Sequence, residues 1–126
     1  MEPNKTMSVN SRKNSFAYAF SGLSQLFKQE PNARLHAIAT IVAITVGIIK
    51  HINTMQWVAI VFAIGLVWIT EAINTCIENL CNFCCENKIH PEIKIIKDVA
   101  AGAVLVAALV SFSVGLAVFI FGKSWS

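Results

Sequence analysis

The chain has 126 residues, of which 56% are hydrophobic and 13% charged, and its mean hydropathy is +0.63. A soluble domain carries about 25% charged residues, and a chain this short cannot bury so much apolar surface in water because small domains have a large surface for their volume. The composition therefore excludes an ordinary soluble domain and predicts an integral membrane protein, and a net charge of +3 without a dense basic run gives no reason to expect a nucleic-acid partner.

The N-terminal part divides into a polar tail and an amphipathic segment. Residues 1–14 are polar and are expected to be flexible. Residues 15–29 are predicted to form a helix, because their apolar side chains recur at helical spacing on one face. Such a helix favours the membrane surface; the alternative is the core helix of a soluble domain, which nothing else in the chain supports. The apolar face consists of Phe16, Phe20, Leu23 and Phe27.

Three later segments are predicted to span a membrane, at about residues 31–50, 56–80 and 98–122. The first begins at Pro31, which suits a first helical turn, and it only just reaches the roughly 20 residues that a span requires. The last segment is the clearest, because it holds no charged residue from Val99 to Gly122. The predicted fold is all-α: one membrane-embedded domain with a surface helix and three transmembrane helices.

Lys and Arg residues fall mainly on one side of these spans. The tail, the surface helix and the loop near residue 90 hold eight of them, whereas the other side holds Lys50 and Lys123. Because cytosolic loops are rich in Lys and Arg, this distribution predicts a cytosolic N-terminus and a C-terminus outside. The eight residues are Lys5, Arg12, Lys13, Lys28, Arg34, Lys88, Lys94 and Lys97.

Four cysteines crowd into ten residues, at Cys76, Cys81, Cys84 and Cys85. No secretory signal precedes them, so a disulfide framework is not expected in a cytosolic region. Together with His90, the last three of them could be read as a zinc site. However, a structural zinc site needs four converging ligands, and adjacent cysteines on a helix point apart. Small packing residues at a helix end are the favoured interpretation.

The most informative pattern lies in the second predicted span. Four polar residues at positions i, i+3, i+4 and i+7 share one helix face. If the span begins near Trp57, Glu71 lies about 21 Å along it, in the cytosolic third of a core of about 30 Å. A charge at mid-span costs roughly 2.5–3.5 kcal/mol, so such a residue is a functional candidate. The alternative is a helix that has already left the membrane at Thr70. The four residues are Glu71, Asn74, Thr75 and Glu78.

Two further groups are predicted to lie at the same interface. Glu30 separates the surface helix from the first span, and Lys97 and Asp98 directly precede the last span. Glu30 and Glu78 could hold Mg²⁺, which prefers oxygen ligands, while Lys97 could neutralise phosphate. Glu71 could then take the proton of a hydroxyl group, which is the arrangement that phosphoryl transfer needs. Taken alone, Lys97 is an ordinary flanking lysine and Glu30 a solvated carboxylate.

The segments Glu71–Glu78 (EAINTCIE) and Lys97–Leu105 (KDVAAGAVL) together resemble the bacterial diacylglycerol kinase and undecaprenol kinase family. The resemblance covers residues 14–122. The run from Asp98 to Leu105, and His90-Pro91, are closer to the undecaprenol kinase branch. No Walker-type glycine loop is present, so a kinase of this sequence must use another architecture.

This resemblance implies an ATP-dependent and Mg²⁺-dependent lipid kinase of the bacterial inner membrane, acting in phospholipid biosynthesis as a homotrimer with active sites shared between subunits. It implies Glu71 as catalytic base, Glu30 and Glu78 as metal ligands, and Asn74 and Arg34 as positioning groups. The nucleotide-binding residues that it implies are Tyr18, Glu30, Glu78, Lys88, His90, Lys97 and Asp98.

The sequence departs from the family pattern at two positions. Asn82 stands four residues after Glu78, where the family often has Asp, so this position carries no charge here. Arg12 lies about one position away from a basic residue that contacts nucleotide in the family.

Two other functions are compatible with a glutamate in a membrane helix. A small proton-coupled transporter would place that glutamate near the membrane midplane, in a water-lined path. A non-catalytic scaffold would give no reason for Glu71, Asn74 and Glu78 to share a face. The expected function is therefore phosphorylation of a lipid alcohol, undecaprenol or diacylglycerol, at the cytosolic interface.

Overall fold

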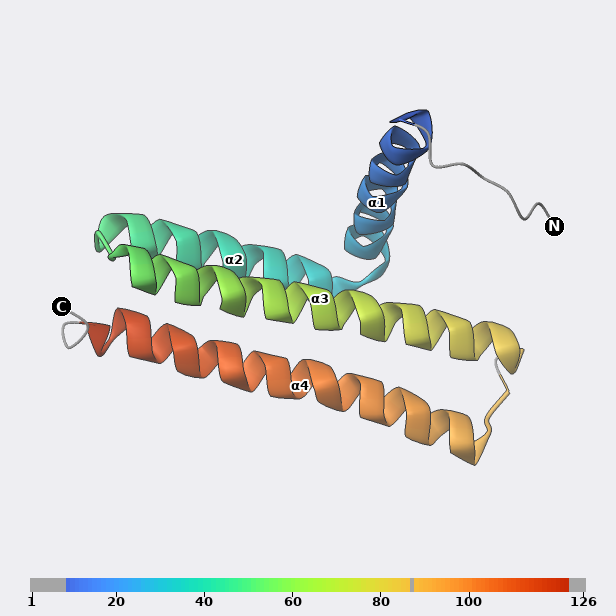
Figure 1. Cartoon of the computed structure of the whole chain (residues 1–126). Helices are drawn as coiled ribbons and strands as arrows, with labels where there is room; N and C mark the ends of the chain where they lie inside the picture. The colour runs from blue at the N-terminus through green and yellow to red at the C-terminus, as the bar shows by residue number, and fades with distance from the viewer. Residues whose placement is uncertain (1–8, 87, 123–126) are drawn as a thin grey trace.

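The computed structural model describes residues 9–86 and 88–122, and all regular secondary structure in this part of the chain is α-helical (Figure 1). This confirms the predicted all-α class with an N-terminal helix and three membrane-spanning candidates. The four helices are α1 (Val9–Gln29), α2 (Pro31–Ile49), α3 (Thr54–Cys84) and α4 (Pro91–Phe119).

The helices α2, α3 and α4 are each long and apolar enough to cross a membrane. With 19 residues, α2 is about 28 Å long, which matches a hydrocarbon core of about 30 Å. The 31 residues of α3 and the 29 of α4 extend over about 46 and 43 Å. Both helices must therefore project beyond the membrane, and Figure 1 shows them running past α1 at the end that carries the α3–α4 loop.

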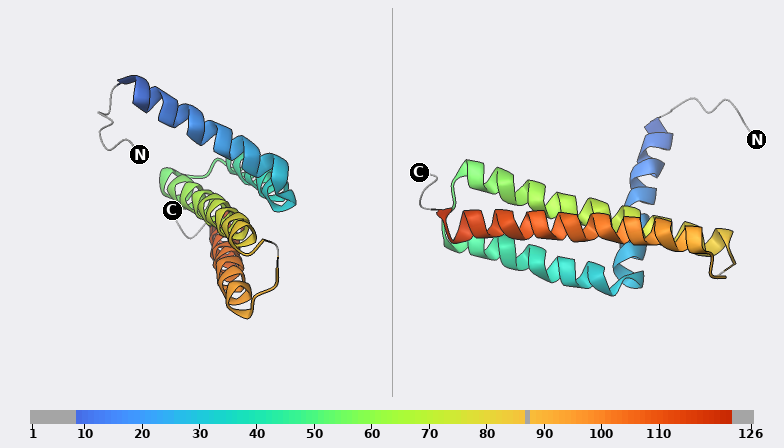
Figure 2. Two further views of the ribbon diagram at one scale, coloured as in Figure 1. Left: turned by 90° about the vertical axis from the view of Figure 1, so that its right-hand side faces the viewer. Right: turned by 90° about the horizontal axis from the view of Figure 1, so that it is seen from below.

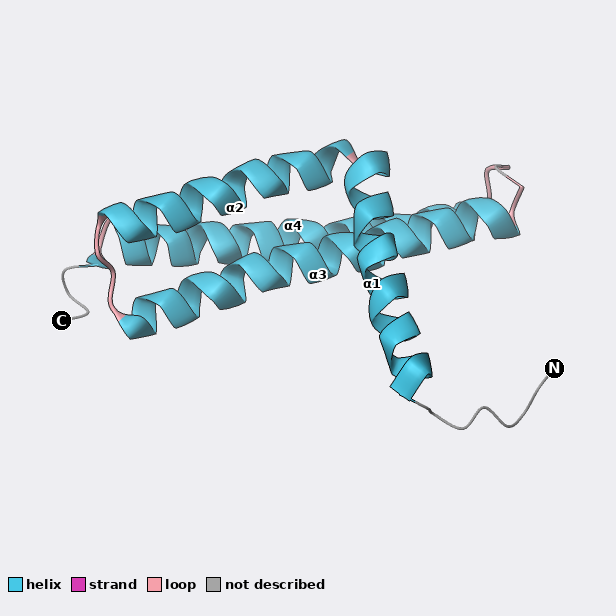
Figure 3. Ribbon diagram, turned by 90° about the horizontal axis from the view of Figure 1, so that it is seen from above, coloured by secondary structure: helices cyan, strands magenta, loops and turns pink. Residues whose placement is uncertain are grey.

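α1 runs steeply across the other three helices, which lie roughly alongside one another (Figures 1 and 3). Its large apolar side chains stay exposed, including Phe16 and Phe20, and Leu26 is buried. This orientation is compatible with the predicted location of α1 at a membrane surface. α1 begins at Val9, six residues before the start expected from the sequence, because residues 10–14 contain no Pro or Gly and continue the helix outward from Phe16.

The helices α3 and α4 pack against each other along most of their length (Figure 2). α4 starts at Pro91, seven residues before the span predicted at about residues 98–122. Pro91 occupies the first helical position, which it suits, and the polar turns that follow belong to the part of the helix outside the hydrocarbon. Lys5 and Lys123, which entered the prediction of orientation, lie outside the described residues.

The α2–α3 turn and the end of α4 form what we call the capped end, made of Lys50, Asn53, Gln56 and Gly122. Asn53 and Gln56 form a reciprocal capping box at the start of α3. The Gln56 side-chain amide also donates to the Gly122 carbonyl at 3.1 Å. The Lys50 ammonium donates to the Phe119 carbonyl, where a cation is favourable at a helix C-terminus.

Close helix approach within one chain occurs at Gly47, where an added Cβ would lie 2.8 Å from the Trp57 ring. At Gly102 and Gly115 an added Cβ would meet nothing within 4 Å. Many large apolar side chains on all three long helices are exposed, such as Ile41, Phe62 and Leu109. These surfaces suit lipid or further protein in a membrane, since water would not tolerate so large an apolar area.

Candidate active site

One stripe of α3 carries the polar residues that the sequence singled out. Glu71 is 1% exposed, Asn74 and Thr75 are buried, and Glu78 is half-buried. The surrounding sequence of α3 is apolar and unbroken by Pro, so the helix continues through these positions although they are polar. The stripe therefore lies inside the molecule and does not face lipid.

Several polar atoms of this stripe are buried without a hydrogen-bond partner. They include both carboxylate oxygens of Glu71, the side-chain oxygen of Asn74 and the hydroxyl of Thr75. The Asn74 amide nitrogen donates to Glu78 Oε1 at 3.2 Å. Because an unsatisfied buried polar group costs about 1–3 kcal/mol, and more when charged, such a concentration indicates a place for a ligand, an ion or water.

Glu30 joins this stripe from a different part of the chain. It is the N-cap residue of α2, yet its side chain makes no capping hydrogen bond, so the carboxylate is available for another role. Burial, and then the negative charges of Glu78 and Glu71, raise the pKa of Glu30 above its ordinary value. Three carboxylates from two helices thus interact within a single chain. We call Glu30, Glu71 and Glu78 the acidic cluster.

The acidic cluster has the donor set that a hard divalent cation prefers. Among residues 9–86 and 88–122, no three His, Cys, Asp or Glu side chains are arranged to hold a metal ion by themselves. Mg²⁺ is usually bound through one or two carboxylates together with substrate phosphates and water. Glu30 and Glu78 fit that pattern, because burial and then repulsion from Glu78 and Glu71 raise the pKa of Glu30, and a cation between the carboxylates would relieve that repulsion.

The lysine and aspartate that precede the apolar part of α4 lie beside α3 but have separate partners. The Lys97 ammonium donates to Asn82 Oδ1 at 3.0 Å. This hydrogen bond links α4 to α3 one helical turn beyond Glu78. Asp98 instead pairs with Lys94 at 2.6 Å on the exposed side of α4. Asn82 therefore has a defined role in holding Lys97, although it lacks the charge that the family often has there.

The remaining residues implied by the resemblance are all exposed. Tyr18 and Arg12 lie on α1, while Lys88 and His90 lie between α3 and α4. Arg34 donates to the Lys28 backbone carbonyl at 3.3 Å, so it supports the junction between α1 and α2. The structure therefore brings Glu30, Glu71, Asn74 and Glu78 together and leaves these five residues at the periphery.

His36 is a residue beside the acidic cluster that the sequence did not single out. Its Nε2 atom lies 3.5 Å from Glu71 Oε2. One signal was available in the antiparallel α2–α3 pair: His36 lies 14 residues before Lys50, and Glu71 lies 17 residues after Thr54. At about 1.5 Å per residue, the two side chains fall within about one helical turn of the same depth.

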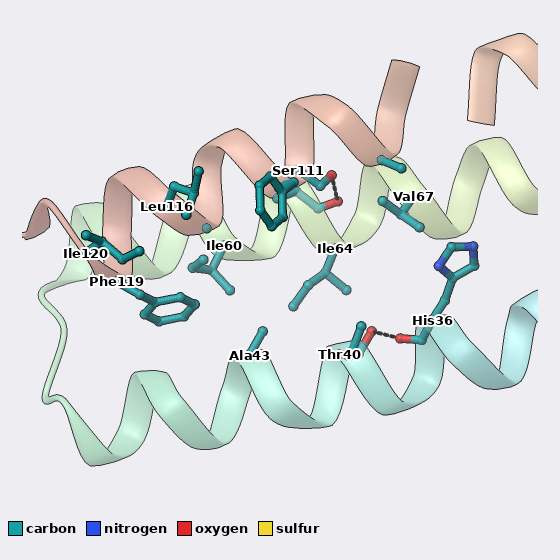
Figure 4. A pocket seen from close by; sticks show the side chains of 15 residues that line it. His36, Thr40, Ala43, Ile60, Ile64, Val67, Ser111, Leu116, Phe119 and Ile120 are labelled. Carbon is teal, nitrogen blue, oxygen red and sulfur yellow. Dashed lines mark hydrogen bonds between the residues drawn. The ribbon is translucent and has the colours of Figure 1, made fainter. Parts of the chain in front are cut away.

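An apolar cavity of about 470 Å³ lies between α2, α3 and α4. His36 stands at one end of it, and Phe119 and Ile120 stand at the other (Figure 4). Between them the walls are mostly Ala, Ile, Val and Phe side chains, with Thr40 and Ser111 as hydroxyl groups. The Ser111 hydroxyl donates to the Ala63 carbonyl, so it leaves little polarity in the cavity. The cavity can hold hydrocarbon and ends beside the acidic cluster.

The four cysteines do not form a metal site in the described part of the chain. All four thiols are free, and the Cys85 thiol donates to the Cys81 carbonyl at 2.8 Å, one helical turn earlier. A second cavity of about 490 Å³ lies at this end of the molecule. It is lined by Cys84, Cys85, His90, Pro91, Glu92 and Ile93.

Comparison with known proteins gives relatives over most of the chain. A diacylglycerol kinase from Synechocystis sp. is 35% identical over 101 residues, which is 80% of this chain and 58% of that protein. An undecaprenol kinase from Bacillus subtilis is 34% identical over 106 residues, which is 84% of this chain and 85% of that protein. The chain thus spans little more than half the length of the Synechocystis relative. No solved structure matches.

The two identities are nearly equal and do not separate the diacylglycerol and undecaprenol branches. The family model described as "Prokaryotic diacylglycerol kinase" matches residues 17–119, which include α2, α3, α4 and the whole acidic cluster. This match confirms the resemblance first indicated by the segments Glu71–Glu78 and Lys97–Leu105. The chain belongs to the prokaryotic diacylglycerol kinase family.

Proposed function

We propose that this protein transfers the γ-phosphoryl group of ATP to the hydroxyl group of a membrane lipid alcohol, undecaprenol or diacylglycerol, in a reaction that requires Mg²⁺. The observation that carries the proposal is the acidic cluster: three interacting carboxylates, one of them fully buried without a hydrogen-bond partner, at one end of an apolar cavity. A proton-coupled transporter would need its glutamate at the midplane, whereas this cluster gathers where α1 meets the spans.

Glu71 acts as the general base in this reaction. Its carboxylate takes the proton of the lipid hydroxyl as the hydroxyl oxygen forms a bond to the γ-phosphorus. The bond between that phosphorus and the bridging oxygen breaks, and ADP leaves with the electron pair. Glu71 suits the task because its oxygens have no hydrogen-bond partner in the protein, and Asn74 lies one turn further along the same face. A positioned base contributes about 10²- to 10⁴-fold to the rate.

The other groups bind and orient the nucleotide. Glu30 and Glu78 would hold Mg²⁺, which supplies positive charge to the phosphates when bound. Lys97 is held by Asn82 and contacts phosphate as a point charge. Arg34 keeps the α1–α2 junction in place, and Asn74 orients Glu78. The outer contacts to the nucleotide come from Tyr18, Lys88, His90 and Asp98.

The active site lies at the cytosolic interface of the bacterial inner membrane, with the N-terminus in the cytosol. The excess of Lys and Arg at this end supports that orientation. We further propose a homotrimer in which neighbouring subunits contribute to each site. The exposed apolar side chains on α2, α3 and α4 provide surfaces for such an assembly, while the acidic cluster itself forms within one chain.

Radiolabelled ATP tests the proposal directly. Purified protein in detergent or vesicles is incubated with diacylglycerol or with undecaprenol, each with Mg²⁺ and with EDTA, and labelled lipid is extracted. Label is expected in at least one lipid and only with Mg²⁺, and the better substrate identifies the physiological class. ATP turnover that is absent with both lipids would contradict the proposal.

A further inference from the structure

We propose that His36 is a positioning residue for the base, holding one oxygen of Glu71 so that the other faces the lipid hydroxyl. The inference rests on the proposed function, because it assigns a role within the same reaction. It comes from the geometry of a half-buried side chain on α2 and a buried side chain on α3 that face each other.

The contact between the two side chains is close and has no competitor. His36 Nε2 and Glu71 Oε2 lie 3.5 Å apart, with the side chains 16% and 1% exposed. Neither atom has any other hydrogen-bond partner. Contacts of this kind are often long in the unliganded enzyme and tighten when substrate binds. With its hydrogen on Nε2, the imidazole donates toward Oε2, which leaves Oε1 as the oxygen that accepts the proton.

The imidazole is held in place by its own neighbours. The Trp68 ring meets it edge to face, with centroids 6.3 Å apart and an angle of 65° between the planes. The Trp68 indole nitrogen donates to the Thr40 hydroxyl at 3.0 Å, and that hydroxyl donates to the His36 carbonyl at 2.7 Å. Trp68 and Thr40 therefore hold the ring against α3, as a group that orients a base requires.

The position of His36 also explains how a lipid could reach the base. His36 forms one end of the apolar cavity between α2, α3 and α4 (Figure 4). A hydrocarbon chain lying in this cavity would end at His36, next to Glu71. The polar end of a lipid alcohol would then meet the free oxygen of the base, whereas ATP would approach from the side of Glu30 and Glu78.

Only the lipid hydroxyl and Glu71 exchange a proton in this arrangement. The hydroxyl proton moves to Glu71 Oε1 during phosphoryl transfer, and His36 keeps its own hydrogen throughout. The histidine therefore affects the rate of the chemical step but makes no contact with ATP. Replacing it should lower kcat and leave the KM for ATP unchanged.

The test compares two amide substitutions at His36 that differ in the position of the side-chain nitrogen. In His36→Gln the side-chain nitrogen lies near the position of Nε2, whereas in His36→Asn it lies near that of Nδ1. His36→Gln is expected to keep kcat within about threefold of the wild type, and His36→Asn to lose about tenfold or more, since a well-placed base contributes about 10²- to 10⁴-fold. Equal kcat values in the two variants, or wild-type kcat in His36→Asn, would overturn the proposal.

Thr45→Val is the matched control on the same helix. The Thr45 hydroxyl bonds the carbonyl of the residue four positions earlier, as the Thr40 hydroxyl does, but it is exposed. This variant should keep wild-type kcat, whereas Thr40→Val, which removes the Trp68 partner, should lower it. A loss of kcat in Thr45→Val equal to that in Thr40→Val would indicate general helix damage and contradict the positioning role.

A second readout needs neither ATP nor lipid. A hydrophobic carbodiimide modifies protonated carboxyl groups in membrane helices, and mass spectrometry measures the modified fraction of Glu71. Without an N–H group at the position of Nε2 facing Oε2, Glu71 should react faster in His36→Asn than in the wild type or in His36→Gln. If the wild type lacks kinase activity but this order holds, the function is wrong and the contact is right. Identical labelling rates in an active kinase would reject the contact alone.

Discussion

The capped end and the acidic cluster differ in whether their polar side chains have hydrogen-bond partners. At the capped end, Asn53 and Gln56 exchange hydrogen bonds, Gln56 reaches the Gly122 carbonyl, and Lys50 binds the last turn of α4. Around the acidic cluster, the Glu71 oxygens and the Thr75 hydroxyl are buried and unpaired. Both regions involve α2 and α3, so the contrast reflects their separate roles and does not come from different helices.

This contrast shows which polar groups stabilise the fold and which are available for chemistry. A satisfied buried group contributes to stability, whereas an unsatisfied one lowers it and persists only where something else requires it. Substitutions at the capped end should therefore reduce stability without changing turnover. Substitutions around the acidic cluster should reduce turnover and leave stability unchanged or improved. The following predictions test that division.

The largest effect is expected for Glu71→Gln. Because the amide cannot accept the hydroxyl proton, kcat should fall by about 10²- to 10⁴-fold, while the melting temperature should not fall. Radiolabelled ATP transfer to lipid and thermal melting in detergent measure the two quantities. Glu92→Gln, an exposed acid in the first turn of α4, is the control and should retain full activity. Full activity in Glu71→Gln would remove the base assignment.

A smaller loss is expected for Lys97→Met. Hydrogen bonds to charged groups are worth about 1.5–3 kcal/mol, so the KM for ATP should rise by roughly ten- to a hundredfold. Lys50→Met makes the same change at the capped end, where Lys50 binds the Phe119 carbonyl. That variant should melt at a lower temperature with its KM for ATP unchanged. Equal KM values in the two variants would contradict the nucleotide contact.

Next to the capped end, Gly47→Ala should lower the free energy of unfolding by about 1–3 kcal/mol. The new methyl group would lie 2.8 Å from the Trp57 ring and 3.1 Å from Ile52. Turnover per folded molecule should stay at the wild-type value. Gly22→Ala in the exposed part of α1 meets nothing within 4 Å and should be neutral or stabilising by up to about 1 kcal/mol. Melting curves that fall equally for both variants would exclude the steric explanation.

The smallest effect concerns pH and Glu30, which lies outside the spans. Because burial and the charges of Glu78 and Glu71 raise its pKa, the folded metal-free protein keeps a proton that the unfolded chain has already released. Stability should therefore fall as pH rises from below the ordinary glutamate pKa through the raised value. The melting temperature in EDTA should follow this slope, and Glu30→Gln should flatten it. A slope identical in wild type and variant would refute the electrostatic origin.

Local patterns made much of the fold predictable. The uncharged stretch in α4 and the apolar run in α3 indicate membrane helices because their composition leaves no soluble alternative. The helix ends were less accurate, as α1 and α4 begin several residues earlier than expected. Hydropathy marks only the part of a helix that lies in hydrocarbon, whereas the helical hydrogen bonds continue until a Pro, a Gly or a cap ends them.

The candidate site was predictable where its residues share one helix. The spacing of Glu71, Asn74 and Glu78 defines one face of α3 whatever the helix packs against. His36 did not stand out, because a histidine on an apolar face has no helical periodicity that distinguishes a ligand-facing side chain from a packing one. The partner of Lys97 was equally hidden, since Asn82 lies on another helix.

The sequence by itself determined a membrane protein with three spans and one row of acids and amides on a single helix. These features follow from composition and from the fixed geometry of the α-helix. Only the tertiary structure decided that Glu30 approaches Glu78 and Glu71 and that His36 faces Glu71 at the end of an apolar cavity. Such encounters depend on the register and rotation of one helix against another, which the packing of all side chains sets together.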